Sequence, residues 1–213
     1  PAKGQFAPSD LMRLAESSNR PVTQEDKIRL FLSGFSALYQ SNVEKGLRML
    51  VRDHAHSHFC VGEKVPDRPS LLDLLRRDHR VLSVVTIRHP IDSYLGLENN
   101  GWLHFQPASI DEYVTRYERF LDDYAEHPMF RYEDFVENPD ENLQAICATL
   151  GLPFPAGYQD LFMAHSFSGD SGRKSEVIKA RPRREMSDSV RSDLRQSRPL
   201  HALCERLDYD LGI

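Results

Sequence analysis

The sequence predicts an α/β fold, in which helices flank a parallel β-sheet. Short apolar runs rich in β-branched residues alternate along the chain with longer segments whose apolar residues recur at helical spacing. Most of the longer segments open with residue types that cap helices. An alternation of strand with helix is typical of a parallel sheet that is covered on both faces.

The first third of the chain predicts a long helix, a strand and a short helix. Thr23 and Asp26 form an acidic variant of a capping box, and apolar residues follow at helical spacing. Residues 47–51 predict a strand because they are mostly apolar. Ser70 and Asp73 then predict the start of a short helix.

The clearest buried strand lies in "HRVLSVVTIRHP", residues 79–90, which is β-branched and closed by Pro90. A helix is expected to begin just after this proline. Arg88 stands at the exit of the strand, and the carboxyl edge of a parallel sheet is where open α/β folds bind ligands. A guanidinium there forms paired hydrogen bonds with phosphate-like anions, although an ion pair at the strand end explains the same pattern.

The following segments continue the alternation. Ser109 predicts the start of a long helix, and "MFRYEDF", residues 129–135, predicts another strand. Glu133 lies on that strand and is expected to be a partner for an arginine. Asn138 and Pro139 then supply the cap and the first residue of a further helix.

Composition narrows the class of protein. With 213 residues, 40% of them hydrophobic and 28% charged, the chain is expected to form a globular domain. The net charge of −5 argues against a general nucleic-acid-binding protein. Three widely spaced cysteines without a C-x-x-C motif predict reduced thiols and a cytoplasmic location. No apolar run reaches membrane-spanning length, so no membrane partner is expected.

Two further segments carry groups suited to chemistry. "VRDHAHSHF" contains His54, His56 and His58, which would share one face of an extended segment. Residues 167–186, "FSGDSGRKSEVIKARPRREM", combine glycines with basic residues. Glycine permits backbone conformations that direct amide groups at an anion, and Arg173 adds positive charge.

In this order, the motifs resemble the sulfotransferase family that uses 3′-phosphoadenosine 5′-phosphosulfate (PAPS). "TIRHPIDSYLG" is similar to the family's 3′-phosphate-binding strand, turn and helix, and "FRYEDFVENPDENLQAICATLGL" to its characteristic strand and helix. "LVRDHAH" resembles the strand that ends at the catalytic histidine, and "GDSGRK" the C-terminal basic element. The resemblance covers about residues 47–184 and implies a fold like that of P-loop nucleotide kinases and sulfotransferases.

The resemblance implies a nucleotide site. Arg88 would bind the 3′-phosphate, and Arg173, Lys174 and Arg181 would close over it. The family usually offers a serine hydroxyl eight positions after the arginine, where this chain has Gly96.

Ser93, one helical turn earlier, is the alternative hydroxyl for that site. In residues 167–186, the basic residues follow the glycines, whereas many family members place them before.

The resemblance also implies the reaction. His54 or His56 would remove the proton of an acceptor hydroxyl or amine as it attacks sulfur, because imidazole titrates near neutral pH. The product is then 3′-phosphoadenosine 5′-phosphate (PAP), the acceptor is a small molecule or a saccharide, and no metal is required.

One family element is not visible. The 5′-phosphosulfate loop should precede the other motifs, and residues 1–10, "PAKGQFAPSD", lack the apolar strand that should come before it. We therefore expect residues 1–213 to be a single sulfotransferase-like domain without its first strand and loop. A homo-oligomer is expected if another copy supplies that loop.

Two alternatives stay open. The chain could be a non-catalytic sulfotransferase-like module that binds a nucleotide or a partner. It could also be a metal-dependent hydrolase, because His54, His56 and His58 offer three imidazoles to a metal such as zinc. The catalytic interpretation fails if His54→Ala and His56→Ala leave every activity unchanged, whereas a tightly bound zinc favours the hydrolase.

Overall fold

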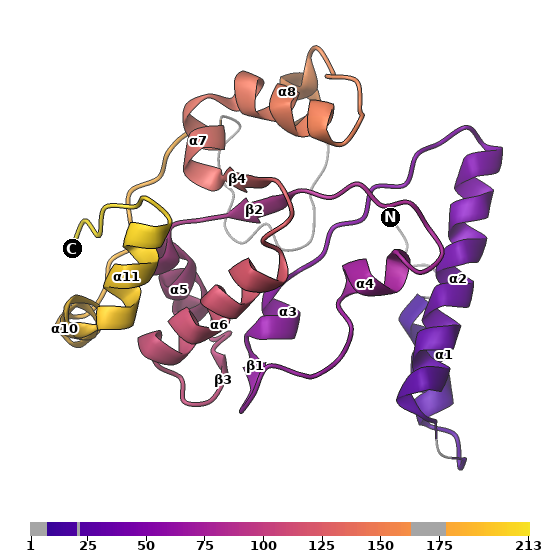
Figure 1. Ribbon diagram of the computed structural model, residues 1–213, viewed down its shortest axis with the longest axis horizontal. Helices are drawn as coiled ribbons and strands as arrows, with labels where there is room; N and C mark the ends of the chain where they lie inside the picture. Colours follow the sequence, from indigo (N-terminus) through magenta and orange to yellow (C-terminus); the bar gives the residue numbers. More distant parts are fainter. Residues whose placement is uncertain (1–7, 21, 163–177) are drawn as a thin grey trace. The chain divides into compact units, whose positions relative to one another are not determined.

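A computed structural model describes residues 8–20, 22–162 and 178–213 (Figure 1). The chain divides into two compact units. The first consists of Pro1–His54 with Arg68–Val81, and the second of Ala55–Asp67 with Leu82–Ile213.

The first unit is helical. It contains α1 (Pro8–Glu16), α2 (Gln24–Glu44) and α4 (Leu71–Leu75). The capping boxes predicted at the starts of α2 and α4 are both present and reciprocal, which confirms the two helix starts. Among the described helices, α2 included, none is both long and apolar enough to cross a membrane.

The predicted strand over residues 47–51 is wrong. This segment has no ladder partner among the described residues, and Leu50 is 76% exposed. An apolar run is compatible with a strand, but a strand forms only where a neighbouring backbone offers hydrogen bonds.

The second unit carries two short pairs of parallel strands. β1 (Val61–Gly62) pairs with β3 (His104–Phe105), and β2 (Val85–Ile87) pairs with β4 (Met129–Arg131). The predicted parallel arrangement is therefore confirmed. In the described residues each sheet has two strands, and β2 is shorter than the apolar run that predicted it.

Helices surround these strands. Their bounds are α3 (His56–Phe59), α5 (Pro90–Asn99), α6 (Ile110–Asp123), α7 (Tyr132–Glu137), α8 (Pro139–Thr149), α9 (Tyr158–Phe162), α10 (Asp188–Gln196) and α11 (Arg198–Arg206). The predicted strand over residues 129–135 ends at Arg131, and the remainder begins α7. Glu133 and Asp134 lie in the first turn of α7, where acidic side chains interact favourably with the helix dipole.

The core of the second unit lies where α5, α6 and α11 meet, and these helices are side by side in Figure 1. Leu95 of α5, Val114 of α6 and Leu203 of α11 are fully buried in one apolar cluster. Of these helices, α5 directly follows β2, and α6 lies between β3 and β4 in the chain.

A buried arginine joins α6 to the segment that contains α3 and β1. The Arg116 side chain is 1% exposed and donates to three carbonyl groups, those of Phe59, Val61 and Gly62, at 2.8–2.9 Å. Its Nε also donates to the Glu112 carboxylate at 2.7 Å. The sequence analysis did not single out Arg116, although its spacing of four residues from Glu112 is typical of a helical ion pair.

The three cysteines are free and buried. Burial raises the pKa of the Cys60 and Cys204 thiols to about 11 in each case. Both thiols are therefore protonated at neutral pH.

Candidate functional site

The turn between β2 and α5 is built by its own residues. The β-branched strand ends at Ile87, and Pro90 occupies the first position of α5, where no backbone N–H is needed. His89 caps the helix, because its Nδ1 accepts a hydrogen bond from the Ile91 N–H at 3.2 Å. The predicted helix start at the proline is confirmed.

Arg88, between the strand and this cap, is fixed at its backbone. The Tyr117 hydroxyl donates to the Arg88 carbonyl oxygen at 2.9 Å, and the Tyr117 hydroxyl oxygen accepts from the Arg88 N–H at 3.4 Å. The guanidinium carbon lies 4.9 Å from the centre of the Tyr132 ring. An aromatic face stabilises and orients a cation in this position.

The Arg88 side chain retains an unmatched donor. Its Nε is buried and has no hydrogen-bond partner in the described part of the chain. No carboxylate of the described residues pairs with this guanidinium, so the structure gives no support to a strand-end ion pair. Because an unsatisfied buried donor costs free energy, an anion that accepts from Arg88 would be stabilised there.

Ser93 lies in the first part of α5, and Gly96 lies one helical turn further along the helix. Burial raises the pKa of the Tyr113 phenol, whereas a hydrogen bond with Ser93 and the positive charge of Arg88 lower it. Arg88 and Ser93 therefore approach the same buried phenol. A Cβ atom built on Gly96 meets no atom within 4 Å, so there is open space beside this glycine.

The three histidines do not share one face. His56 and His58 belong to α3, in which residues two apart point about 200° apart around the axis. His54 precedes the helix and is partly buried in the first unit. The expectation of three aligned imidazoles is wrong, because an extended segment was assumed where a helical turn forms. In the part of the chain that the structure describes, no three potential ligands are placed to hold a metal ion.

His56 has a defined environment. Its ring is stacked on the Trp102 indole, with 5.9 Å between ring centres and 6° between planes. Trp102 follows α5 in the chain. His56, Trp102 and α5 all belong to the second unit.

The predicted anion-binding loops are only partly described. Arg173 and Lys174 lie outside the described residues, as do residues 1–7 of the N-terminal segment. Arg181 is exposed.

Arg183, from the same basic run, is half-buried and forms an ion pair with Asp92 of α5 at 3.1 Å. The sequence did not separate Arg183 from its basic neighbours, because its partners lie far away in the chain.

Glu133 holds neutral donors rather than an arginine. Its Oε1 accepts from the His89 N–H at 3.0 Å, and its Oε2 accepts from the Tyr209 hydroxyl at 2.7 Å. The predicted arginine partner is therefore wrong. The extended strand on which that prediction rested does not include Glu133, since the residue lies in the first turn of α7.

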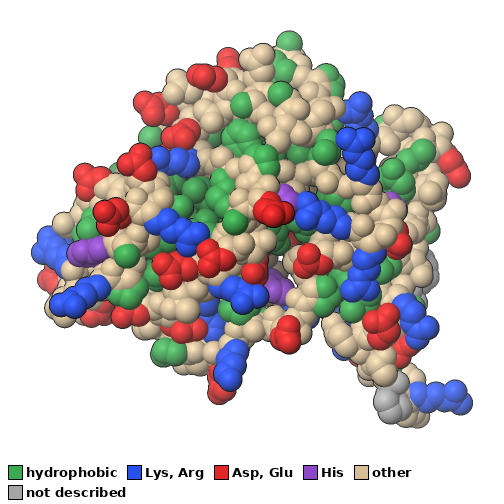
Figure 2. All heavy atoms as spheres, in the orientation of Figure 1, with side chains coloured by type: hydrophobic (Ala, Val, Ile, Leu, Met, Phe, Trp, Pro, Cys, Tyr) green, Lys and Arg blue, Asp and Glu red, His purple; other side chains and the backbone are tan. Residues whose placement is uncertain are grey.

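Charged side chains of both signs lie on the face of the second unit that Figure 2 shows. In Figure 2, red and blue side chains are interspersed over the region of α6, α10 and α11. On this face an anion would be bound by particular residues rather than by a broad basic surface.

Comparison with known families gives one result. A model described as the sulfotransferase family matches residues 9–156, which is more than two thirds of the chain. Neither the curated proteins nor the solved structures compared with the chain give a match. The matched region contains Arg88, Ser93 and Gly96, whereas Arg183 and Tyr209 lie beyond it.

Proposed function

Because the chain belongs to the sulfotransferase family, we propose that it transfers a sulfuryl group from PAPS to an acceptor hydroxyl or amine. The observation that carries the proposal is the Arg88 guanidinium, which is oriented by the Tyr132 ring and has an unmatched buried donor. A phosphate oxygen is the kind of acceptor that such a group binds.

The surroundings of Arg88 suit a 3′-phosphate. Arg88 immediately precedes the N-terminus of α5, where the helix dipole favours negative charge. Ser93 lies one turn into the helix and carries a hydroxyl that can donate to a phosphate oxygen. In the proposed site Arg88 supplies charge and geometry, and Ser93 supplies an additional hydrogen bond.

The reaction requires a base on the acceptor side. We assign this role to His56, which belongs to the same unit as Arg88 and whose ring is stacked on Trp102. The base takes the acceptor proton as the acceptor oxygen or nitrogen bonds to sulfur. The bond between sulfur and the phosphate oxygen breaks, and PAP leaves.

Calorimetric titration of the chain with PAP, with 5′-AMP as the matched ligand, tests the proposal. The two ligands differ in the 3′-phosphate, so we expect clear preference for PAP. Equal binding of both ligands, or binding of neither, would count against a 3′-phosphate site in this chain.

Gly96→Ser tests the position of the site on α5. The open space beside Gly96 admits the side chain, and serine favours a helix over glycine by about 0.5 kcal/mol. The added hydroxyl lies on the helix that follows Arg88, so we expect about threefold to tenfold tighter PAP binding from one hydrogen bond.

Gly34→Ser in α2 is the control, because a Cβ atom there also meets nothing within 4 Å. It should raise the melting temperature without changing PAP affinity. Tighter PAP binding in both variants, or in neither, would argue against a phosphate beside Gly96.

His54→Asn and His56→Asn test the assignment of the base. We expect His56→Asn to slow PAP release from PAPS by about a hundredfold, with glycosides, phenols and amines as acceptors, and His54→Asn to leave it unchanged. PAP affinity should not change.

His104→Asn is the control, since His104 is exposed on β3. Wild-type protein that binds PAP but releases none from PAPS with any acceptor would favour the non-catalytic alternative.

A further inference from the structure

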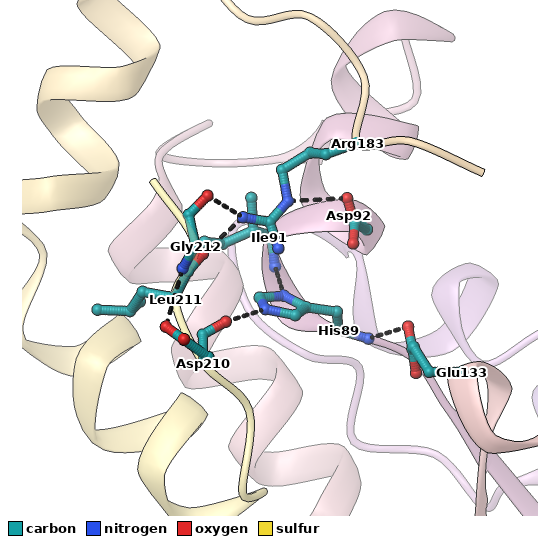
Figure 3. A network of polar contacts seen from close by, with 8 residues as sticks. All are labelled: His89, Ile91, Asp92, Glu133, Arg183, Asp210, Leu211 and Gly212. Carbon is teal, nitrogen blue, oxygen red and sulfur yellow. Dashed lines mark hydrogen bonds and ion pairs between the residues drawn. The ribbon is translucent and has the colours of Figure 1, made fainter. Parts of the chain in front are cut away.

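His89 connects two segments that are 121 residues apart. Its Nδ1 accepts from the Ile91 N–H at 3.2 Å, and its Nε2 lies 2.8 Å from the carbonyl oxygen of Asp210 (Figure 3). A carbonyl only accepts and a backbone N–H only donates, so Nε2 carries the proton and Nδ1 does not. Both contacts together require the neutral imidazole, which is 6% exposed.

Residues 208–213, here called the C-terminal tail, are held at several further points. Arg183 donates to the carbonyl groups of Leu211 and Gly212 at 2.5 and 3.1 Å, while its Nε pairs with Asp92 (Figure 3). Arg183 therefore ties the tail to α5, the helix that His89 caps.

Aromatic contacts complete the attachment of the tail. The Tyr209 ring lies 4.8 Å from the His89 ring, and the Arg131 guanidinium carbon lies 4.0 Å from the centre of the Tyr209 ring. Glu133 accepts both the Tyr209 hydroxyl and the His89 N–H, and so joins the tail directly to the turn after β2.

We propose that His89 is a positioning residue that couples the C-terminal tail to the turn carrying Arg88, and that protonation of His89 releases this coupling and weakens 3′-phosphate binding. The inference rests on the proposed nucleotide site at Arg88. His89 follows Arg88 directly, so a change in the backbone of one moves the other.

The charges around His89 set the direction of its response to pH. Burial is the largest effect and lowers the pKa of the imidazole from its ordinary value of 6.5, and the positive charge of Arg183 lowers it further. The Asp210 carbonyl and the carboxylates of Asp92 and Glu133 raise it, but the net shift is downward. Tyr209, the other titratable group that faces the ring, is neutral at these pH values because burial, the largest cause, raises its pKa.

Below pH 6.5, the protein binds fewer protons when the C-terminal tail is attached to His89 than when the tail is released. The stabilisation by His89 is therefore fully present above the ordinary pKa. It is lost as pH falls below 6.5 toward the lower value of the folded protein. A charged ring would also have a donor at Nδ1 facing the Ile91 N–H, which removes the cap of α5.

His89→Asn separates the two roles of the ring. Asparagine is among the best helix caps, so the start of α5 is retained, while the titratable contact with Asp210 is lost. At pH 8 we expect PAP binding to be about threefold to tenfold weaker than in the wild type. Between pH 8 and pH 5.5 the ratio of the two affinities should fall toward one.

Protonation of the ligand phosphate affects both affinities equally, because both proteins bind the same ligand. Its effect therefore cancels in the ratio of the two affinities. His201→Asn on the exposed surface of α11 is the matched control, and its ratio to the wild type should stay at one throughout. A wild-type to His89→Asn ratio that is constant with pH would overturn the proposal, since a purely structural role would not depend on protonation.

Arg183→Gln approaches the coupling from the tail. It removes the contacts to Leu211 and Gly212, and PAP binding should weaken by about the same factor as in His89→Asn. The double variant should be clearly less than additive, because either change alone releases the tail. Arg195→Gln, an exposed change of the same charge on α10, should have no effect. Additive losses in the double variant would overturn the coupling.

Nuclear magnetic resonance of the ligand-free protein keeps this inference separate from the nucleotide site. Imidazole nitrogen signals should identify the Nε2–H form of His89, and the amides of residues 209–213 should shift in step with its titration. Such a result without any PAP binding would refute the nucleotide site and leave the coupling of His89 to the tail supported. Titration of His89 without movement of these amides would overturn the coupling itself.

Discussion

Replacing Arg88 with alanine is expected to lower the affinity for PAP by about a hundredfold, because two charged hydrogen bonds to the 3′-phosphate are lost. The affinity for 5′-AMP should change little, since that ligand has no 3′-phosphate. The measurement is calorimetric titration of the wild type and of Arg88→Ala with each ligand. The difference between the losses of PAP and 5′-AMP affinity gives the interaction between Arg88 and the 3′-phosphate.

Two further variants show whether charge alone explains the result. Arg88→Lys keeps the charge but loses the planar fork of donors, so its affinity should lie between those of Arg88→Ala and the wild type. Arg195→Ala removes an exposed arginine from α10 and should bind PAP normally. An equal loss of PAP and 5′-AMP binding in Arg88→Ala would indicate a structural role at the strand end instead.

Replacing Arg116 with methionine is expected to destabilise the protein by about 3–5 kcal/mol. The substitution fills similar space but leaves three carbonyl groups, those of Phe59, Val61 and Gly62, without their donor. The Glu112 carboxylate also loses its charged partner. Denaturant unfolding followed by circular dichroism measures the change in the free energy of unfolding.

Arg119→Met is the matched control, because Arg119 lies on the same helix with a side chain that is 65% exposed. Its ion pair with Asp123 is on the surface, so its loss should cost less than about 1 kcal/mol. Similar losses in both variants would mean that the carbonyl groups near β1 find other donors. Because Arg116 anchors the segment that begins with α3, its loss should also disturb His56.

The features that the sequence predicted correctly depend on neighbours in the chain. The capping boxes at Thr23 and Ser70 each require only two residues three positions apart. Pro90 starts α5 because its fixed backbone angle suits the first helical position whatever the surroundings. Arg88 could be singled out for the same reason, since the end of a strand and the start of a helix are both local signals.

The features that the sequence predicted wrongly depend on partners that are distant in the chain. Residues 47–51 have the composition of a strand, but no second strand pairs with them among the described residues. His56 and His58 were expected on one face, and the turn of helix that separates them is stabilised by packing rather than by its four residues alone.

Local sequence signals were sufficient to predict the α/β class, the parallel direction of the strands, the starts of the principal helices and the position of Arg88 at a strand end. The orientation of that arginine on Tyr132 and the burial of Arg116 against the segment of α3 and β1 depend on tertiary packing. The attachment of His89 to the C-terminal tail was likewise decided by the fold. Helix capping and side-chain periodicity act over a few residues, whereas these contacts join residues between 44 and 121 positions apart, whose meeting depends on how the whole unit packs.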